Sequence, residues 1–160
     1  KKGNTTYICF PIEDIDFEEA SFDIILSSLA FHYIENYEEI VDKIHKLLKP
    51  GGYLVFSAEH PVFTAEGSQD WYYDENGKIL HFPVDNYYYE GKRNAVFLGE
   101  PVTKYHRTFT TYISVLLKKG FRLVDVEEPQ PPEEMLNTVP GMKDEMRRPM
   151  MFLVSAQKEK

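Results

Sequence analysis

Two histidines and an arginine are the residues of this chain best suited to moving a proton or binding an anion. His32, with Tyr33 beside it, follows the apolar run Phe22–Leu26 by a few residues, and His106 directly precedes Arg107. Imidazole is a common proton-transfer group, and a guanidinium can bind a carboxylate or a phenolate. We therefore take His32 and His106 as candidate catalytic residues, and Tyr33 and Arg107 as candidates for substrate binding. The alternatives are a histidine satisfied by nearby backbone and an arginine at a solvent-exposed helix entry.

Aromatic side chains are concentrated between residues 59 and 106, where neither a helical nor a strand period persists. Asn76-Gly77 within this segment favours a tight turn, so residues 70–73 and 78–82 can pair as a hairpin. Long irregular segments are often functional, and aromatic rings suit a pocket for an apolar or planar substrate. The same composition occurs in satellite cores and subunit interfaces. We interpret the segment as an insertion and place Trp71 among the candidate substrate-binding residues.

The apolar pattern around His32 predicts a strand, a helix and a second strand. Phe22–Leu26 is a short apolar run with β-branched residues, as in a strand buried in a parallel sheet. Asn36 and Glu39 have the spacing of a helix capping box, and apolar residues then recur at helical spacing until Pro50-Gly51-Gly52. Residues 53–56 start the next apolar strand. Such a βαβ unit is right-handed in nearly all proteins.

The carboxyl-terminal part of the chain predicts a second helix and two more strands. The helix opens at Tyr105–Thr108 and ends near Lys118-Lys119-Gly120. The strands are predicted over 121–126 and 150–156.

Several of these segments resemble one known family. The stretches FDIILSSLAFHYI (22–34) and LLKPGGYLVFS (47–57) are similar to the fourth strand, its helix and the fifth strand of class I S-adenosylmethionine-dependent methyltransferases, in their small-molecule type 11 branch. Ile12–Phe17 looks like the end of the family's third strand, and 120–126 and 150–156 look like its last two strands. The resemblance implies an α/β, Rossmann-like three-layer fold whose mostly parallel sheet has an antiparallel last strand.

The resemblance also implies S-adenosylmethionine as the cofactor and suggests where it would bind. The family holds the adenine ring with an acidic-plus-small pair at the end of its third strand, and the matching positions here are Pro11 and Ile12. Pro11 has neither a backbone donor nor a carboxylate, so the contact must come from the Ile12 backbone, from Glu13 or from nothing, and Glu13 can equally belong to a solvated loop. Ligands of open α/β sheets bind outside the carboxyl ends of the strands. The expected cofactor contacts there are Ser27, Ser28 and Leu29.

Two cofactor-binding features of the family have no counterpart in this chain. The glycine-rich loop after the first strand and the acidic residue ending the second strand are missing, and no G-x-G occurs. We therefore expect residues 1–160 to form a partial methyltransferase domain, lacking the first two strands and carrying an insertion at about 59–106. Such a chain should bind S-adenosylmethionine weakly by itself.

The net charge and the cysteine count exclude several classes of binding partner. Lys and Arg number 18 against 26 Asp and Glu, and the net charge of −8 argues against non-specific binding to nucleic acid or to an anionic membrane. The single cysteine, Cys9, excludes an intrachain disulfide and a cysteine-based zinc site, and no metal site is predicted. With no signal peptide or membrane-length apolar run, we expect a cytoplasmic protein.

The sequence therefore favours an enzyme that transfers a methyl group from S-adenosylmethionine to a small molecule. The alternative is a non-catalytic fragment, or an interaction module that uses the aromatic insertion to bind a protein. On the first view the insertion is a lid, and Trp71 and Arg107 should converge over the cofactor edge of the sheet.

The first prediction concerns the edge of the sheet. In the resembling family, strands one and two separate strand three from strand four, so Phe22–Leu26 becomes an edge with unpaired backbone groups when they are missing. We expect this edge to be paired by a second copy of the chain, by a displaced amino-terminal segment, or by residues upstream of Lys1. Analytical ultracentrifugation tests the homo-oligomer. A monomer whose edge amides exchange as freely as exposed loop amides would contradict the expected pairing.

Overall fold

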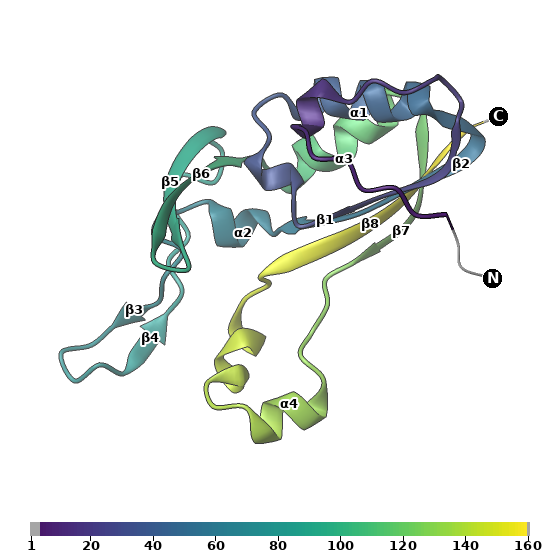
Figure 1. The fold of residues 1–160 in the computed structure, drawn as a ribbon. Coiled ribbons are helices and arrows are strands. Elements are labelled where there is room, and N and C mark those ends of the chain that lie inside the picture. The colour runs from purple at the N-terminus through teal and green to yellow at the C-terminus, as the bar shows by residue number, and fades with distance from the viewer. Residues whose placement is uncertain (1–3, 160) are drawn as a thin grey trace.

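The computed structural model describes residues 4–159, and a four-stranded sheet is its central element (Figure 1). The strand order is β1 (Phe22–Ser28), β2 (Leu48–Glu59), β8 (Met151–Lys158) and β7 (Phe121–Glu127). β1 and β2 pair in parallel, whereas β8 is antiparallel to both β2 and β7. The three forward strands and the reversed last strand confirm the fold class expected from the sequence.

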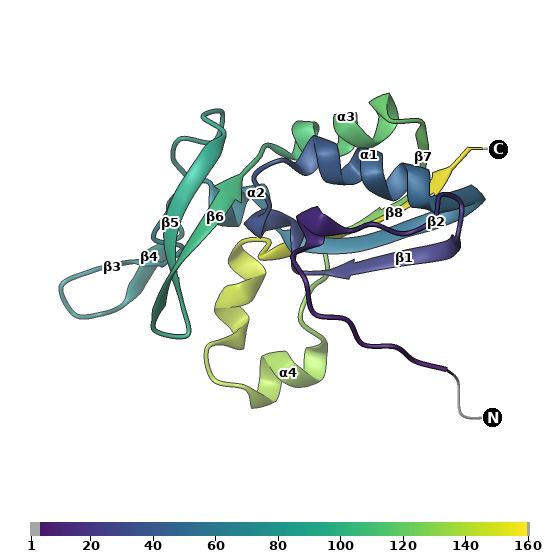
Figure 2. The ribbon, with the colours of Figure 1, turned by 45° about the horizontal axis from the view of Figure 1, so that its top comes forward.

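Two helices cover one face of this sheet, α1 (Tyr37–Leu47) and α3 (Phe109–Lys118) (Figure 2). Asn36 is the residue that caps α1, as predicted, but its side chain donates to the Glu39 carboxylate at 3.4 Å instead of accepting a backbone N–H. Tyr112 of α3 packs its ring on Phe152 of β8, with ring centroids 5.0 Å apart. Aromatic contacts of this kind fill the core between the helices and the sheet.

The turn between α1 and β2 depends on a glycine. A Cβ atom on Gly52 would lie 2.9 Å from the Lys49 carbonyl oxygen and 3.0 Å from the Asp23 carbonyl oxygen. Only a residue without a Cβ allows β1 and β2 to approach this closely. The Pro50-Gly51-Gly52 stretch therefore does more than end the helix, because it also allows the two parallel strands to pair.

The amino-terminal segment differs from the prediction. Residues 5–10 form no strand, and Ile12–Asp14 form the short 3-10 helix η1 instead of the end of a third strand. A strand needs a neighbour for its backbone hydrogen bonds, and within residues 4–159 β1 pairs only with β2. Pro11, which has no N–H, immediately precedes η1, and the Lys43 ammonium of α1 donates to the Glu13 carbonyl oxygen at 2.5 Å.

The insertion between β2 and α3 folds into two hairpins. After the short helix α2 (Pro61–Thr64), β3 (Tyr72–Tyr73) and β4 (Ile79–His81) form the predicted hairpin. The second hairpin, β5 (Gly91–Phe97) with β6 (Glu100–His106), was not predicted. β6 extends through His106, so α3 begins four residues after Tyr105, where its opening was expected. Thr108 caps α3 by accepting the Thr111 N–H.

The connection from β7 to β8 also contains helical structure. It carries α4 (Glu133–Thr138) and the 3-10 helix η3 (Met142–Arg147), which extend from the carboxyl end of β7 (Figure 1). Throughout the described chain, every helix is too short or too polar to cross a bilayer.

The second face of the sheet is only partly covered within the described residues, and it is most exposed on β1. Ile24 and Leu26 of β1, which alternate with the inward-facing Ile25, are 62% and 72% exposed. Both helices of the sheet lie on the opposite face, so the described residues show two of the three layers of the expected fold.

Substitution of two leucines on neighbouring strands tests the difference in burial between the two faces of the sheet. Leu54→Ala removes a side chain that is 0% exposed, whereas Leu26→Ala removes one that is 72% exposed. We expect Leu54→Ala to lower the free energy of unfolding by about 2–5 kcal/mol, because it leaves a cavity. Leu26→Ala should stay within about 0.5 kcal/mol of the unsubstituted chain. Urea denaturation of both variants measures the difference, and equal losses would show that the second face is covered in solution.

Candidate functional site

The candidate site begins where β1 ends. The Leu29 N–H donates to the carbonyl oxygen and the hydroxyl of Ser57, at 3.0 and 3.1 Å, and Leu29 has a φ of 50°. This turn fixes the carboxyl end of β1 to β2. It leaves Ser28 and Leu29 exposed and leads directly into the short 3-10 helix η2 (Phe31–Tyr33).

His32 is buried in η2, and its hydrogen bond fixes its protonation. Its Nδ1 atom accepts the backbone N–H of Glu59 at 3.2 Å, so the neutral ring carries its proton on Nε2. Nε2 lies 3.8 Å from the Glu59 carboxylate. Desolvation lowers the pKa of His32 to about 4, and Lys104 and Arg107 act in the same direction while Glu59 opposes them. At neutral pH His32 is therefore a hydrogen-bond donor through Nε2, without a free lone pair.

A buried charged cluster surrounds this histidine. Lys104 of β6 is 2% exposed, and its ammonium donates to the Glu59 carboxylate at 2.6 Å and to the Gln69 carbonyl oxygen at 2.7 Å. Gln69 in turn donates to the other Glu59 oxygen at 2.9 Å. Both carboxylate oxygens are thus occupied. We call His32, Glu59, Gln69 and Lys104 the polar cluster.

Sequence reasoning missed three members of the polar cluster. Glu59 ends β2, and the rule that placed His32 at the carboxyl edge could have found it. Lys104 and Gln69 lie within the aromatic segment, where no periodicity placed them relative to the sheet.

Arg107 contacts the backbone near His32. Its guanidinium donates to the carbonyl oxygens of Ile34 and of Glu35, the latter at 2.7 Å, and to that of Phe31 at 3.4 Å. The group is 7% exposed and also lies over the rings of two core tyrosines. Arg107 therefore holds the loop that carries His32 and Tyr33. Tyr33 itself is partly exposed, with its ring centroid 4.3 Å from that of His32.

His106 is fully buried, and both of its ring nitrogens have partners. Nε2 donates to the Tyr87 carbonyl oxygen at 2.8 Å, which leaves Nδ1 to accept the Thr64 hydroxyl at 2.7 Å. Burial lowers the pKa of His106, although the bond to Tyr87 opposes the shift. The ring thus joins the end of β6 to α2 and to the loop before β5.

Trp71 lies at the same edge of the sheet, but the expected convergence with Arg107 is not observed. The indole contacts Phe82, at 5.3 Å between ring centroids, and the guanidinium groups of Arg147 and Arg148. Arg147, in the connection between β7 and β8, donates to the Leu80 carbonyl oxygen of the hairpin β3–β4 at 2.6 Å, whereas Arg107 donates to carbonyl oxygens in and after η2. The two side chains therefore contact different groups and do not converge as expected, and the lid role of the insertion stays a prediction.

The residues expected to bind the cofactor lie along the free side of β1. Glu13 is exposed, and Ile12 is partly buried against the core. The Ser27 hydroxyl is buried without a hydrogen-bond partner in the described structure, which is costly unless a ligand or water completes it. The exposed Ser28 and Leu29 follow it directly. These groups fit one wall of a site for a polar ligand such as S-adenosylmethionine.

The fold and the site together are those of an open α/β protein that binds its ligand at the carboxyl edge of the sheet. An open α/β sheet binds its ligands outside the carboxyl ends of its parallel strands, and the polar cluster occupies this position. A methyltransferase domain profile matches residues 1–56.

Known proteins identify the family. A Listeria monocytogenes crystal structure, assigned as an S-adenosylmethionine-dependent methyltransferase, is 51% identical with a TM-score of 0.89, over 99% of this chain and 72% of its own. An S-adenosylmethionine-dependent methyltransferase from Mesorhizobium loti is 36% identical with a TM-score of 0.87, over 98% of this chain and 71% of its own. The chain belongs to the S-adenosylmethionine-dependent methyltransferases, as the resemblance predicted.

Curated relatives extend beyond the matched region. An uncharacterized protein from Haemophilus influenzae is 37% identical over 163 residues, which are 98% of this chain and 62% of the relative. A malonyl-[acyl-carrier protein] O-methyltransferase from Marinomonas is 31% identical over 78 residues, 49% of this chain and 29% of that enzyme. The chain thus spans less than two-thirds of the length of these curated relatives.

The pKa of His32 makes a testable contribution to stability. Its folded value of about 4 lies below the ordinary 6.5, so the unfolded chain binds more protons between these values and stability falls as pH drops through them. His32→Asn keeps an acceptor for the Glu59 N–H but does not titrate. As the pH drops from 6.5 to 4, we expect the unfolding free energy of the variant to fall less steeply. The slope of unfolding free energy against pH should be smaller by the amount that corresponds to about one bound proton. Urea titrations across this range measure both slopes, and parallel curves would contradict the low pKa.

Proposed function

We propose that this protein transfers a methyl group from S-adenosylmethionine to a small-molecule acceptor at the carboxyl edge of β1 and β2. The observation that carries the proposal is the polar cluster, which lies at this edge in a chain that belongs to the S-adenosylmethionine-dependent methyltransferases. The net charge of −8 supports a small molecule over nucleic acid as the acceptor. The single cysteine, which excludes an intrachain disulfide, fits a cytoplasmic location.

The cofactor would lie along β1, with Ile12 and Glu13 toward its adenine and Ser27, Ser28 and Leu29 toward its methionine part. When bound, it supplies an electrophilic methyl group on a sulfonium. The Ser27 hydroxyl can then gain the partner that it lacks, and the fixed turn at Leu29 holds this wall in place. The unpaired edge of β1 suits a further contact, either to a second copy of the chain or to another part of the protein.

The protein's main contribution would be alignment of the acceptor with the methyl group, which is worth an effective molarity of order 10⁵ M or more in well-oriented systems. His32 remains our candidate for contact with the acceptor, as a donor through Nε2 and not as the base first expected. Its lone pair at Nδ1 is already occupied by the Glu59 N–H. Tyr33 would contact the acceptor from the exposed side of η2.

His106 and Arg107 would act through other groups. His106 is buried and bonded at both nitrogens, and Arg107 is bonded to loop carbonyls. We propose that both are positioning residues. An acceptor served by this site then needs a nucleophile that reacts without losing its proton to either histidine, such as a neutral amine or an anion already formed at working pH.

A protein-binding role remains a second candidate because of the second hairpin. Its tip exposes Val96, Phe97 and Leu98, at 66%, 51% and 88%. Exposed apolar side chains at a hairpin tip suit a protein interface. This candidate predicts a partner at the tip instead of a ligand at the end of β1.

Amide chemical shifts can decide between the two candidates. We expect S-adenosylhomocysteine, titrated into the ¹⁵N-labelled chain, to shift the Glu13, Ser28 and Leu29 amides saturably, even if the affinity is only millimolar. The Leu98 and Gly99 amides at the hairpin tip serve as the internal control and should not move. A Kd of about 1 mM corresponds to about 4 kcal/mol of binding free energy. If the amides at the end of β1 show no saturable shift up to about 10 mM S-adenosylhomocysteine, binding is weaker than this and the proposed function is contradicted.

A further inference from the structure

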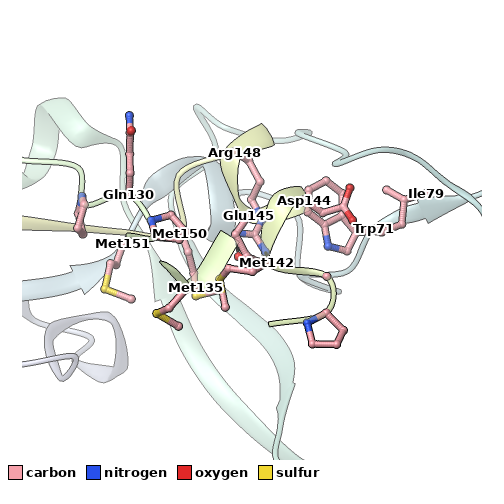
Figure 3. A pocket seen from close by; sticks show the side chains of 14 residues that line it. Trp71, Ile79, Gln130, Met135, Met142, Asp144, Glu145, Arg148, Met150 and Met151 are labelled. Atoms are coloured by element: carbon pink, nitrogen blue, oxygen red, sulfur yellow. Dashed lines mark hydrogen bonds and ion pairs between the residues drawn. The ribbon is translucent and has the colours of Figure 1, made fainter. Parts of the chain in front are cut away.

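A cavity of about 590 Å³ opens beside the polar cluster, between the hairpin β3–β4 and the connection from β7 to β8 (Figure 3). Four methionines line one side and two apolar side chains of the hairpin line the other, with Arg148 and Glu145 between them. The lining is mostly apolar, and its size falls within the range of small-molecule sites, about 300–1,000 Å³. The methionines are Met135, Met142, Met150 and Met151, the opposite side is formed by Trp71 and Ile79, and Pro129, Pro131 and Pro140 complete the apolar lining.

The charged groups that line this cavity, Asp144, Glu145 and Arg148, form ion pairs, in which Asp144 is paired with Arg147 outside the lining. The Arg148 guanidinium lies 2.7 Å from the Glu145 carboxylate, and that of Arg147 lies 3.0 Å from Asp144. Arg148 is also enclosed by three aromatic rings, those of Phe63, Trp71 and Phe82, 4.8–5.0 Å from its guanidinium carbon. Each of these four charges thus has a partner of opposite sign, although the Arg148 Nε–H is buried without a hydrogen-bond partner in the described structure. Transfer of a charged group into such surroundings is unfavourable.

The cavity adjoins the polar cluster through the sheet and through the chain. Met151 of β8 pairs with Glu59 of β2, and the Met150 carbonyl oxygen accepts the His60 N–H at 2.9 Å. Trp71 follows Gln69, the cluster residue bonded to Glu59, by two positions. Backbone pairing and chain connectivity thus place the cavity lining next to Glu59 and Gln69 of the cluster.

We propose that this cavity binds the body of the methyl acceptor, and that the acceptor is a neutral, mainly apolar small molecule with its polar nucleophilic atom at one end. This proposal rests on the proposed function and adds the substrate class. The methionine side chains suit such a ligand, because unbranched thioethers adapt their shape to an apolar partner. Trp71 supplies a flat apolar wall, and the nucleophilic end lies toward Glu59 and His32.

The chain's single tryptophan reports directly on the cavity. The test uses 1-octanol and octanoate, which share a chain length and do not absorb where Trp71 is excited. We expect octanol to change the Trp71 emission saturably and to bind about tenfold or more tightly than octanoate, because the carboxylate must lose its hydration. The Trp71→Phe variant gives the background signal.

A matched pair of substitutions locates the response. Met135→Glu places a carboxylate in the cavity, whereas Met146→Glu makes the same change in the neighbouring η3, outside the cavity lining. Both methionines are partly exposed, so both variants should fold, and circular dichroism checks this. We expect Met135→Glu to weaken octanol binding by about tenfold or more and Met146→Glu to leave it within about twofold.

The outcomes separate the cavity from the cofactor site. A missing saturable response, equal effects of the two glutamates, or tighter binding of octanoate would overturn the inference, whatever the S-adenosylhomocysteine titration shows. Octanol binding as expected, in a chain whose β1 end does not respond to S-adenosylhomocysteine, would overturn the acceptor role and the proposed function together. Octanol binding combined with the expected amide shifts supports both.

Discussion

The parallel pairing of β1 with β2 is the constraint on which the candidate site depends. It brings the carboxyl ends of two strands, separated by a helix in the sequence, to one edge of the sheet. There the turn at Leu29 is bonded to Ser57, and Glu59 meets His32. The pairing itself requires Gly52, because a side chain at this position would collide with the carbonyls of both flanking segments. A backbone requirement thus determines which side chains can meet.

The polar cluster shows how burial turns titratable groups into fixed donors and acceptors. Lys104 and Glu59 pair inside the protein, where loss of one partner would leave an uncompensated charge. His32 is held neutral beside them, in a single tautomer. Such a site is suited to holding an acceptor in a fixed direction more than to exchanging protons with it.

The sequence predicted the elements that depend on local pattern. The capped helix after Asn36, the reversal at Pro50-Gly51-Gly52 and the hairpin around Asn76-Gly77 all lie where turn residues and apolar spacing placed them. The third-strand assignment for Ile12–Phe17 was wrong, because a strand depends on a neighbour that the segment itself does not encode. The order of the strands in the sheet was predicted from the family resemblance and not from local pattern.

The site was predicted less completely, for a related reason. His32 was found because it follows a recognisable strand, whereas Gln69 and Lys104 reach it from an insertion without periodicity. Arg107 was predicted to bind the substrate, but its N–H donors are occupied by the carbonyl oxygens of a loop more than 70 positions earlier in the chain. Contacts between such distant segments follow from the three-dimensional fold and leave no local pattern in the sequence.

The bonds from Arg107 to the η2 loop also constrain the order of folding. The guanidinium joins residues 73 positions apart when it binds the Ile34 carbonyl, so this loop closes across the whole of α1, β2 and the insertion. Contacts of such separation form slowly, because the entropy of closing the intervening chain must be lost first. The sheet pairing of β1 with β2 is more local and can form earlier. The loop that carries His32 and Tyr33 would then reach its final conformation late in folding, after the insertion has packed against the sheet.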